Sequence, residues 1–349
     1  MLFSEKILIW YGHNKRTLPW RRTKDPYKIW LSEIMLQQTR VAQGTPYYLK
    51  FIAAFPTVQD LAETSEEKVL KLWQGLGYYS RARNLHATAK KVANEYGGKF
   101  PDNYKGLLKL KGIGDYTASA IASICFDEPQ AVVDGNVYRV LSRYFGVDLP
   151  INSTRGIKHF KKLALEVMNT ENVRDYNQGI MEFGAIQCTP KKPYCLHCPL
   201  NDGCIALKEG KVAVLPVKEN KIKIRKRYFN YLVPIYKNGG NDASTHLRQR
   251  KSKGIWQGLW EFPLLESKNG VTTEYIQKKY TEIVDVKKLN GISLFNEDFI
   301  VHKLSHQHLY TKFWILECED RPKDGIPVSR LEEFPVPVLI ADFIKTFKF

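Results

Sequence analysis

The chain has 349 residues and a formal net charge of +17, from 53 lysines and arginines against 36 acidic residues. This length is too great for one ordinary domain and suits two, each with its own core. No run of about eighteen apolar residues is present, so we expect no membrane-spanning segment. An excess of basic residues is weak evidence for a particular partner by itself. Together with specific motifs that agree with it, it favours a polyanionic partner.

Residues 1 to about 205 have the apolar spacing of helices. Apolar residues recur at helical intervals in segments that are bounded by Gly and Pro. Examples are Leu61, Val69, Leu70, Leu72 and Trp73, and later Phe160, Leu163, Leu165 and Val167.

Glu33 has unusual neighbours if residues 30–40 form a helix. The positions three and four residues away are Ile29, Trp30, Leu36 and Gln37, which are mostly apolar. A carboxyl group on such a face loses water, so its pKa should rise, as suits a general acid. The alternative is a surface glutamate on an amphipathic helix.

A tight turn occupies the middle of residues 107–118. An apolar helix end runs into Gly112-Ile113-Gly114, and a second helix is expected to open at Thr117. Glycine permits the backbone angles of a tight turn, and amides at a helix N-terminus bind phosphate. A plain packing corner between two helices explains the same residues equally well.

Asp134 follows the apolar run 131–133 and precedes Gly135 and Asn136. This places a carboxylate at the mouth of the next helix, where the helix dipole favours the ionised form. The alternative is an ordinary N-cap aspartate.

Four cysteines, Cys188, Cys195, Cys198 and Cys204, are separated by six, two and five residues. Thiolates this close along the chain can bind one zinc ion or one iron-sulfur cluster, and the spacing alone does not separate the two. Two disulfides, or a cluster of unrelated core cysteines, are the alternatives. Glu5 and Lys6 interrupt the apolar N-terminus, so a secretory signal is not expected and a reducing cytoplasm is.

Residues 211–227 end in a basic run and are expected to form an extended linker between a domain at 1–210 and another at 228–349. Tyr228–Tyr236 and Lys312–Cys318 are aromatic and β-branched, which is typical of strands. The second domain is therefore predicted to mix helices and strands.

The turn, the aspartate and the cysteine loop, in this order, resemble the helix-hairpin-helix DNA glycosylase superfamily, in particular its iron-sulfur members, the endonuclease III and MutY families. The resemblance implies an all-α glycosylase domain in which the four cysteines hold a [4Fe-4S] cluster and the turn around Gly112 and Gly114 binds DNA.

Two features resemble the MutY branch. Tyr116 stands where the strand-cutting enzymes carry a lysine, and a phenol cannot form a Schiff base. Residues 18–21 and 30–39 match the opening of the MutY family almost letter for letter. The resemblance implies a monofunctional adenine glycosylase, acting on double-stranded DNA with adenine opposite 8-oxoguanine or guanine.

In such an enzyme, Glu33 would protonate N7 of the flipped adenine, and Asp134 would stabilise the oxocarbenium-like sugar. Tyr116 and Asn136 would support this pair by hydrogen bonding. We expect the protein to act as a monomer.

The resemblance extends to further contacts with DNA. Trp20, Arg21 and Gln178 match adenine-pocket residues, and Gln38 and Thr39 match residues that enter the duplex. Leu76, Gly77 and Tyr78 match a loop that wedges into the base stack. For Leu76 and Tyr78, helix-end packing is the alternative.

The C-terminal part resembles the MutT-like, or Nudix-like, domain of MutY enzymes, an α+β fold, through residues 254–263 and 303–308. After Pro263 the chain lacks the Arg-Glu and Glu-Glu cluster that a working Nudix hydrolase uses to bind magnesium. Lesion recognition is therefore the better role. The resemblance implies that Ser305 and His306 distinguish 8-oxoguanine from guanine, while a polar hairpin turn is the alternative.

Overall fold

The computed structural model describes residues 1–219, 223–237, 243–286, 288–322 and 324–349. It divides into two compact units, one made of Met1–Glu63 and Asn84–Asn220, the other of Thr64–Arg83 and Lys221–Phe349. No helix among the described residues is long and apolar enough to cross a membrane.

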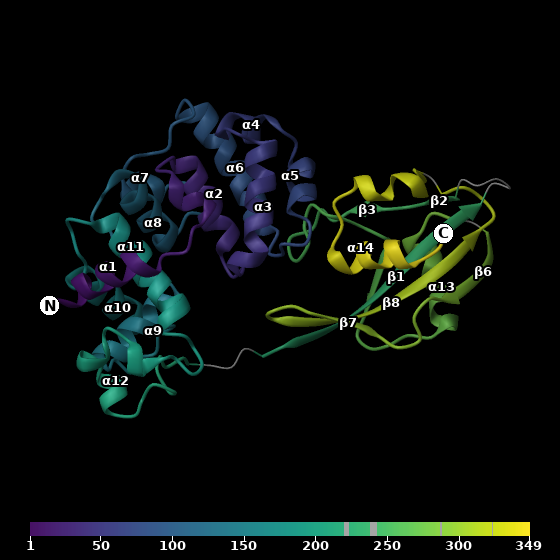
Figure 1. Ribbon diagram of the computed structural model, residues 1–349. Helices are drawn as coiled ribbons and strands as arrows, with labels where there is room; N and C mark the ends of the chain where they lie inside the picture. The colour runs from purple at the N-terminus through teal and green to yellow at the C-terminus, as the bar shows by residue number, and fades with distance from the viewer. Residues whose placement is uncertain (220–222, 238–242, 287, 323) are drawn as a thin grey trace. The chain divides into compact units, whose positions relative to one another are not determined.

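The first unit is helical (Figure 1). Its helices, with α6 running in from the second unit, are α1 (Phe3–Asn14), η1 (Pro19–Arg22), α2 (Pro26–Leu36), α3 (Val41–Ala54), α4 (Val58–Glu63), α6 (Ser80–Glu95), α7 (Tyr104–Leu107), α8 (Asp115–Phe126), α9 (Gly135–Phe145), α10 (Thr154–Glu166), α11 (Val173–Glu182), the π-helical turn η2 (Phe183–Gln187), η3 (Cys195–His197), η4 (Asn201–Gly203) and α12 (Ile205–Lys208).

Local sequence explains where several of these helices begin. The side chains of Asp25, Asn103, Asp134 and Ser153 each accept a hydrogen bond from a backbone N–H in the first turn of the helix that follows. Large side chains of this unit, such as Trp30, Phe51 and Phe160, are fully buried. The predicted helical character of this half is confirmed. Leu165, however, is exposed, and α10 ends before Val167.

The predicted turn lies between α7 and α8. Gly112 has a φ of +79°, which L side chains rarely adopt, and an added Cβ would lie 2.9 Å from the Asn84 Cβ. Gly114 is the extended N-cap residue of α8. Helix α8 begins at Asp115, two residues earlier than the sequence suggested, so the backbone amides after Gly114 open the helix directly.

The second unit is built on a mixed sheet. Its strands are β1 (Arg225–Lys237), β2 (Ala243–Thr245), β5 (Leu264–Ser267), β6 (Leu289–Leu294), β7 (Ile300–Lys303), β8 (Gln307–Cys318) and β9 (Ile326–Pro327), and β3 (Arg248–Gln249) pairs with β4 (Trp260–Glu261) in a separate ribbon. Strands β1 and β8 run parallel over eleven residue pairs, while β5 and β7 are antiparallel to β1 and β8 respectively. The remaining helical segments are α5 (Glu66–Trp73), α13 (Thr273–Ile283), η5 (Val328–Glu333) and α14 (Val338–Thr346).

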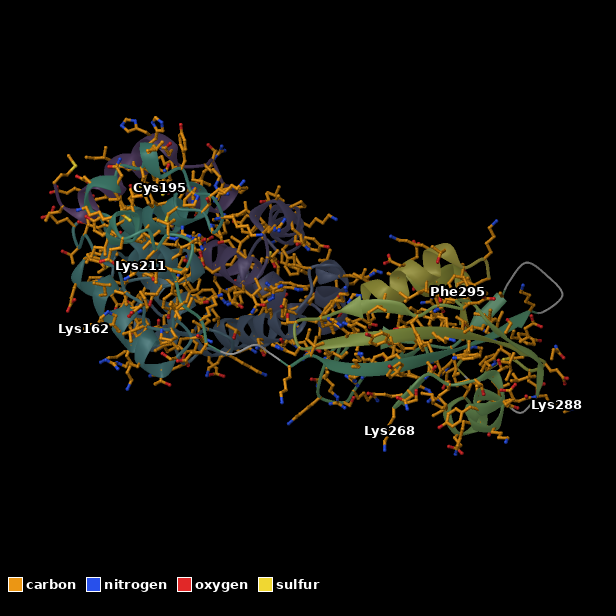
Figure 2. The ribbon with its side chains drawn as sticks, turned by 90° about the horizontal axis from the view of Figure 1, so that it is seen from below. Lys162, Cys195, Lys211, Lys268, Lys288 and Phe295 are labelled. Atoms are coloured by element: carbon orange, nitrogen blue, oxygen red, sulfur yellow. The ribbon has the colours of Figure 1, made fainter. Side chains whose placement is uncertain are left out.

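Helices α13 and α14 cover opposite faces of this sheet (Figure 1). Ile276 of α13 packs with Leu232 and Trp314, whereas the Phe343 ring of α14 stacks on Phe313. Phe295, which follows β6, lies beside α14 in Figure 2, and its ring meets Phe343 edge-on. Both predicted strands are confirmed as parts of β1 and β8.

Strand β1 begins at Arg225, so the end of the basic run predicted as linker is part of the sheet. The reason is that residues 225–227 pair with residues 307–309 of β8. Of the predicted linker, residues 220–222 lie outside the described residues.

Residues 64–83 belong to the second unit although they lie inside the helical half of the sequence. Glu67 of α5 accepts a hydrogen bond of 2.6 Å from the Trp260 indole, and Lys71 donates to the Phe334 carbonyl at 3.1 Å. The side chain of Gln74 accepts from the Val336 amide at 3.2 Å. These polar contacts hold the segment that ends in the loop of residues 74–79.

Candidate active site

The first unit contains an open cavity of about 630 Å³. It lies where α2, α8, α9 and α11 converge. Predicted residues that line it are Trp20, Arg21, Glu33, Gln38, Thr39, Gly114, Tyr116, Asp134, Asn136 and Gln178. Residues separated by more than 150 positions in the sequence thus meet in one place, and Gly112 lies outside the lining.

Glu33 is buried, and the hydroxyl of Tyr116 donates a hydrogen bond of 2.7 Å to its Oε2. Burial raises the pKa of Glu33 to about 7, and the charge of Asp134 acts in the same direction, while the Tyr116 hydrogen bond and Arg21 oppose it. Helix α2 ends at Leu36, earlier than residue 40, because Gln38 takes a left-handed φ of 54°. Gln38 and Thr39 therefore lie in a loop at the cavity.

Asp134 caps α9. Its Oδ1 accepts hydrogen bonds of 2.8 Å from the amides of Asn136 and Val137, and its Oδ2 accepts one of 2.8 Å from the Asn136 side chain. Burial nevertheless raises the pKa of Asp134 above its usual value, while these donors oppose the rise. The sequence predicts that the helix dipole favours the ionised form of this carboxylate; the donors act in that direction, but the loss of water outweighs them in the pKa.

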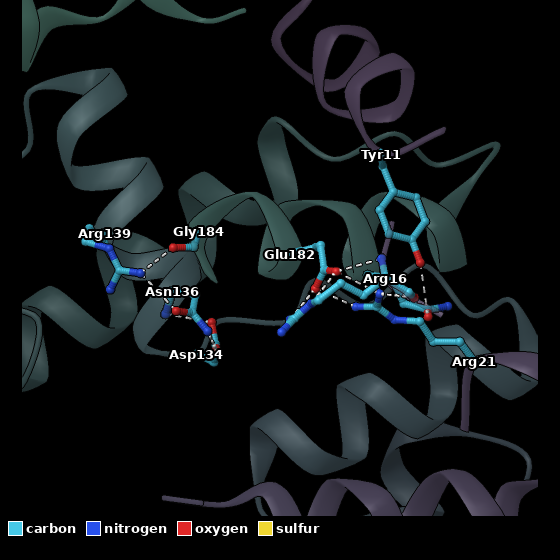
Figure 3. A network of polar contacts seen from close by, with 9 residues as sticks. Tyr11, Arg16, Arg21, Asp134, Asn136, Arg139, Glu182 and Gly184 are labelled. Atoms are coloured by element: carbon cyan, nitrogen blue, oxygen red, sulfur yellow. Dashed lines mark hydrogen bonds and ion pairs between the residues drawn. The ribbon is translucent and has the colours of Figure 1, made fainter. Parts of the chain in front are cut away.

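Glu182 lies on the cavity wall one helical turn after Gln178. Burial would raise the pKa of Glu182, but hydrogen bonds from Arg16 and Arg21 bring it down to about 2. The distances from its oxygens to the two guanidinium groups are 2.6 to 3.0 Å (Figure 3). This ion cluster fixes Arg21 at the cavity, and the sequence analysis did not include Glu182.

Arg139, one turn further along α9, connects the Asp134 site with the cysteine loop. Its guanidinium donates to Asn136 Oδ1 at 2.9 Å and to the Gly184 carbonyl (Figure 3). It also donates to the Cys188 carbonyl at 2.7 Å. Asn136 in turn donates to Asp134. A continuous chain of hydrogen bonds therefore joins Asp134 to the first cysteine of the loop.

The four cysteines of the loop are unpaired and line one small cavity. Arg143 lies beside them, with its Nη1 3.4 Å from the Cys188 sulfur and 2.7 Å from the Thr189 carbonyl. Among the described residues, no group of three or more His, Cys, Asp or Glu side chains is arranged as a site for a metal ion.

A second cavity, of about 590 Å³, lies within the second unit. Its lining includes the predicted residues Leu76, Gly77, Tyr78, Ser305 and His306. Gly77 and Tyr78 both have positive φ, of 77° and 47°. The Tyr78 hydroxyl is hydrogen-bonded to the Ser305 hydroxyl, so the structure brings the loop of residues 74–79 and the turn at 305–306 together.

Sequence comparison places this geometry in a family. Residues 31–163 match the model of the HhH-GPD superfamily base excision DNA repair proteins, and residues 235–346 match the NUDIX domain. Adenine DNA glycosylase of Buchnera aphidicola subsp. Baizongia pistaciae is 39% identical over 90% of this chain and 86% of its own length. The mouse adenine DNA glycosylase is 43% identical over 93% of this chain and 72% of its own length.

The chain belongs to the adenine DNA glycosylase family. It is therefore a DNA N-glycosylase of base excision repair, and the predicted family is confirmed.

Solved structures agree with the fold of this enzyme. A thermostable thymine-DNA glycosylase is similar with a TM-score of 0.56 and 35% identity, over 59% of this chain and 95% of that chain. An endonuclease III in complex with DNA is similar with a TM-score of 0.51 and 21% identity, over 60% of this chain and 99% of that chain, which shows the fold alone. The predicted fold class, a helical glycosylase domain followed by a Nudix-like domain with a sheet, is confirmed.

The sequence did not point to Glu182, which lines the first cavity, or to Arg139, which lies outside both cavities. One feature of the sequence could have indicated that Glu182 lies at the site. It is four residues after Gln178, and this spacing puts both side chains on one face of α11. Arg139 carries no such signal, because the Gly184 and Cys188 carbonyl groups to which it donates lie 45 and 49 residues away.

Proposed function

We propose that the enzyme hydrolyses the N-glycosidic bond of adenine that lies opposite 8-oxoguanine or guanine, without cutting the strand. The observation that carries this proposal is the pair Glu33 and Asp134. Both carboxyl groups line one cavity, near enough for the charge of Asp134 to raise the pKa of Glu33, yet their hydrogen-bond partners differ. Two carboxyl groups in unlike environments are what acid-assisted glycosidic cleavage requires.

In this mechanism the flipped adenine enters the cavity of the first unit. Protonated Glu33 gives its proton to N7, so that the base leaves as a neutral molecule. The Tyr116 hydroxyl, 2.7 Å from Oε2, holds the carboxyl group in place and stabilises the carboxylate that remains. Since Tyr116 has no amine, no Schiff base with the sugar forms at this position.

Asp134 acts on the sugar. As the bond to the base breaks, positive charge develops on the ring, and the Asp134 carboxylate stabilises it until water attacks. The two amides and the Asn136 side chain that donate to Asp134 favour its ionised form and fix its orientation. Trp20, Arg21 and Gln178 line the same cavity and are proposed to contact the adenine.

We also propose that Cys188, Cys195, Cys198 and Cys204 hold a [4Fe-4S] cluster. The four thiols line one cavity, and each would supply one thiolate ligand to the cluster. When bound, the cluster would give this basic loop a fixed shape. We expect iron and sulfide at about four each per chain and broad visible absorption; a colourless protein with stoichiometric zinc would contradict this assignment.

The second unit is proposed to recognise the base opposite the adenine. Leu76, Gly77 and Tyr78 would enter the base stack, as Gln38 and Thr39 of the first unit would, and Ser305 and His306 would contact the opposing base. The support is that Tyr78 and Ser305 share a hydrogen bond at one cavity, which a plain helix-end packing role does not require. The turn at Gly112 and Gly114 is proposed to bind phosphate through its exposed amides.

Single-turnover reactions test the activity, on duplexes that carry adenine opposite 8-oxoguanine, guanine or thymine. We expect release of adenine from the first two, with strand breaks only after alkali. Glu33→Gln and Asp134→Asn should each abolish most of the activity, whereas Glu63→Gln, at an exposed glutamate outside the cavity, should not.

Two outcomes would overturn the proposal. Absence of adenine release from every duplex would leave a DNA-binding or redox role. A protein-DNA adduct trapped by borohydride in high yield would instead indicate a bifunctional glycosylase and lyase, against the assignment of Tyr116.

A further inference from the structure

One face of the sheet in the second unit carries lysines and aromatic rings that no helix covers. Directly paired residues of neighbouring strands point to the same face. Lys226 and Tyr228 of β1 pair with His308 and Tyr310 of β8, and β7 pairs Val301 with Tyr310 and Lys303 with His308. Lys312 lies on this face as well, two residues after Tyr310. We call this surface the platform, made of Lys226, Tyr228, Phe299, Val301, Lys303, His308, Tyr310 and Lys312.

Helix α13 covers only the far half of this face. Leu232 and Trp314, further along β1 and β8, are buried against Ile276. In contrast, Lys226, Val301 and Lys303 are exposed, and Tyr228, Phe299 and Tyr310 are only partly buried. The β7–β8 hairpin in Figure 1 extends away from α13. The platform is thus a solvent-facing surface that leads to the turn at Ser305 and His306.

Aromatic rings support the ammonium groups of the platform. The Tyr228 and Tyr310 rings stack with centroids 5.2 Å apart, and Phe299 meets both edge-on. The Lys226 ammonium lies 5.9 Å from the Tyr310 centroid, and that of Lys312 lies 5.1 Å from the Phe299 centroid. Cation–π contacts of this kind hold a lysine in place without neutralising its charge.

The platform also lacks a compensating anion. Among the described residues of these strands, the salt bridges of Arg227 with Glu266 and of Arg250 with Glu261 lie on the opposite face of the sheet. None of the three platform lysines has a carboxylate partner in the described part of the chain. Lys268, in the loop after β5, adds another charge nearby, and its side chain points into solvent in Figure 2.

We propose that the platform binds the phosphate backbone of duplex DNA beside the recognised base pair. When a two-stranded ribbon enters a DNA groove with its turn leading, each face of the ribbon lies along one phosphate backbone. Since the Ser305–His306 turn joins the two strands of such a ribbon, the platform lies along the ribbon beside the cavity of the second unit, and Lys303 lines that cavity as well. Lysines without carboxylate partners are suited to phosphate, which positions the protein without reading sequence. The proposal rests on the proposed role of the turn.

The test measures how DNA affinity depends on salt. Each protein–phosphate contact contributes about 0.9 to the slope of log Kd against log salt concentration. In Lys226→Gln/Lys312→Gln, this slope should fall by about 1 to 2. The probe is a duplex with 2′-fluoroadenosine opposite 8-oxoguanine, which resists hydrolysis, and the same series is run on an undamaged duplex.

The control variant is Lys278→Gln/Lys345→Gln, which removes two exposed lysines from α13 and α14 of the same unit. It should keep the native slope, as should Lys226→Arg/Lys312→Arg, which retains the charges. The rate of adenine release at saturating DNA should stay unchanged in the control variant Lys278→Gln/Lys345→Gln. Equal slopes for the platform and control glutamine variants, or an unchanged slope in the platform variant, would overturn the proposal.

The two proposals fail in different ways. If the native protein releases no adenine, the proposed function is wrong, but the undamaged duplex still shows whether the platform contacts phosphate. If adenine release is normal and the platform variant keeps the native slope, the platform inference alone is wrong.

Discussion

Glu33 and Asp134 occupy the same cavity, but the groups that face them differ in kind. Glu33 accepts one hydrogen bond, from a phenol, in a buried setting. Asp134 accepts three, two of them from backbone amides at the start of α9. A single weak donor leaves burial to dominate, so Glu33 can exchange a proton near neutral pH. Three donors resist protonation of Asp134 although burial raises its pKa as well.

The pKa of Glu33 predicts how the reaction depends on pH. If Glu33 must be protonated to act, the single-turnover rate should be constant well below pH 7 and fall about tenfold per unit above it. In Glu33→Gln the residual rate should be lower by about 10² to 10⁴ and should lose this pH dependence. A native rate that stays constant from pH 6 to about 9 would contradict the general-acid role.

The same group predicts a change in stability. The folded-state pKa of about 7 lies above the ordinary value of 4.5, so the folded state is favoured by protonation and loses stability as pH rises between these values. At pH 8, Glu33→Gln should therefore raise the free energy of unfolding by up to about 3 kcal/mol. At pH 4 it should change little. Denaturant titrations at both pH values measure this, with Glu63→Gln as the control.

Sequence reasoning reached some residues of the site and missed others for identifiable reasons. The burial of Glu33 follows from neighbours on its own helix, which are visible in the sequence. The partners of Glu182 are not visible, because Arg16 and Arg21 lie more than 150 residues away in the chain. The direction of the Asp134 pKa shift depends on the burial of this side chain in the folded chain, and helix-dipole reasoning contains no such contribution.

At the level of elements, α9 serves two purposes. Its first turn positions Asp134 and Asn136, and its next two turns carry Arg139 and Arg143, which hold carbonyl groups of the segment around Cys188. The orientation of Asn136 and the position of the cysteine loop are therefore mechanically connected through one helix. Loss of this connection should therefore alter the hydrogen bonding of Asp134.

Arg139→Gln tests this connection. The variant loses the guanidinium that donates to Asn136, Gly184 and Cys188, so Asn136 becomes free to turn away from Asp134. Loss of a hydrogen bond to a charged group is worth about 1.5–3 kcal/mol, so the rate of adenine release at saturating DNA should fall tenfold or more. DNA affinity should change less than the rate.

The control is Arg155→Gln, at an exposed arginine on α10. Iron content is measured in parallel, because a loss of rate with full iron content identifies the effect on Asn136. Native rates in Arg139→Gln would contradict the connection.

At the level of the whole molecule, neither unit is one continuous stretch of the sequence. The chain leaves the first unit after Glu63, packs α5 and the loop of residues 74–79 with the C-terminal unit, and returns along α6. Sequence composition cannot predict this, because α5 has the same amphipathic pattern as its neighbours. Its contacts with Trp260, Phe334 and Val336 appear only in the folded structure.

This arrangement predicts that Tyr78 and Ser305 recognise the opposing base as a pair. Because their hydroxyls share a hydrogen bond, Tyr78→Phe and Ser305→Ala should each weaken binding of the 8-oxoguanine duplex by about threefold to tenfold. The double variant should be no weaker than the more affected single variant, since both remove the same interaction. Tyr275→Phe, at an exposed tyrosine of α13, is the control.

The single and double variants of Tyr78 and Ser305 should affect DNA binding but not the rate of base release. Neither residue lines the cavity that holds Glu33 and Asp134, so adenine release from bound DNA should keep its native rate in all three variants. Binding of the duplex with guanine opposite adenine should change less than that with 8-oxoguanine. Losses of affinity that multiply in the double variant would show that Tyr78 and Ser305 contact DNA independently.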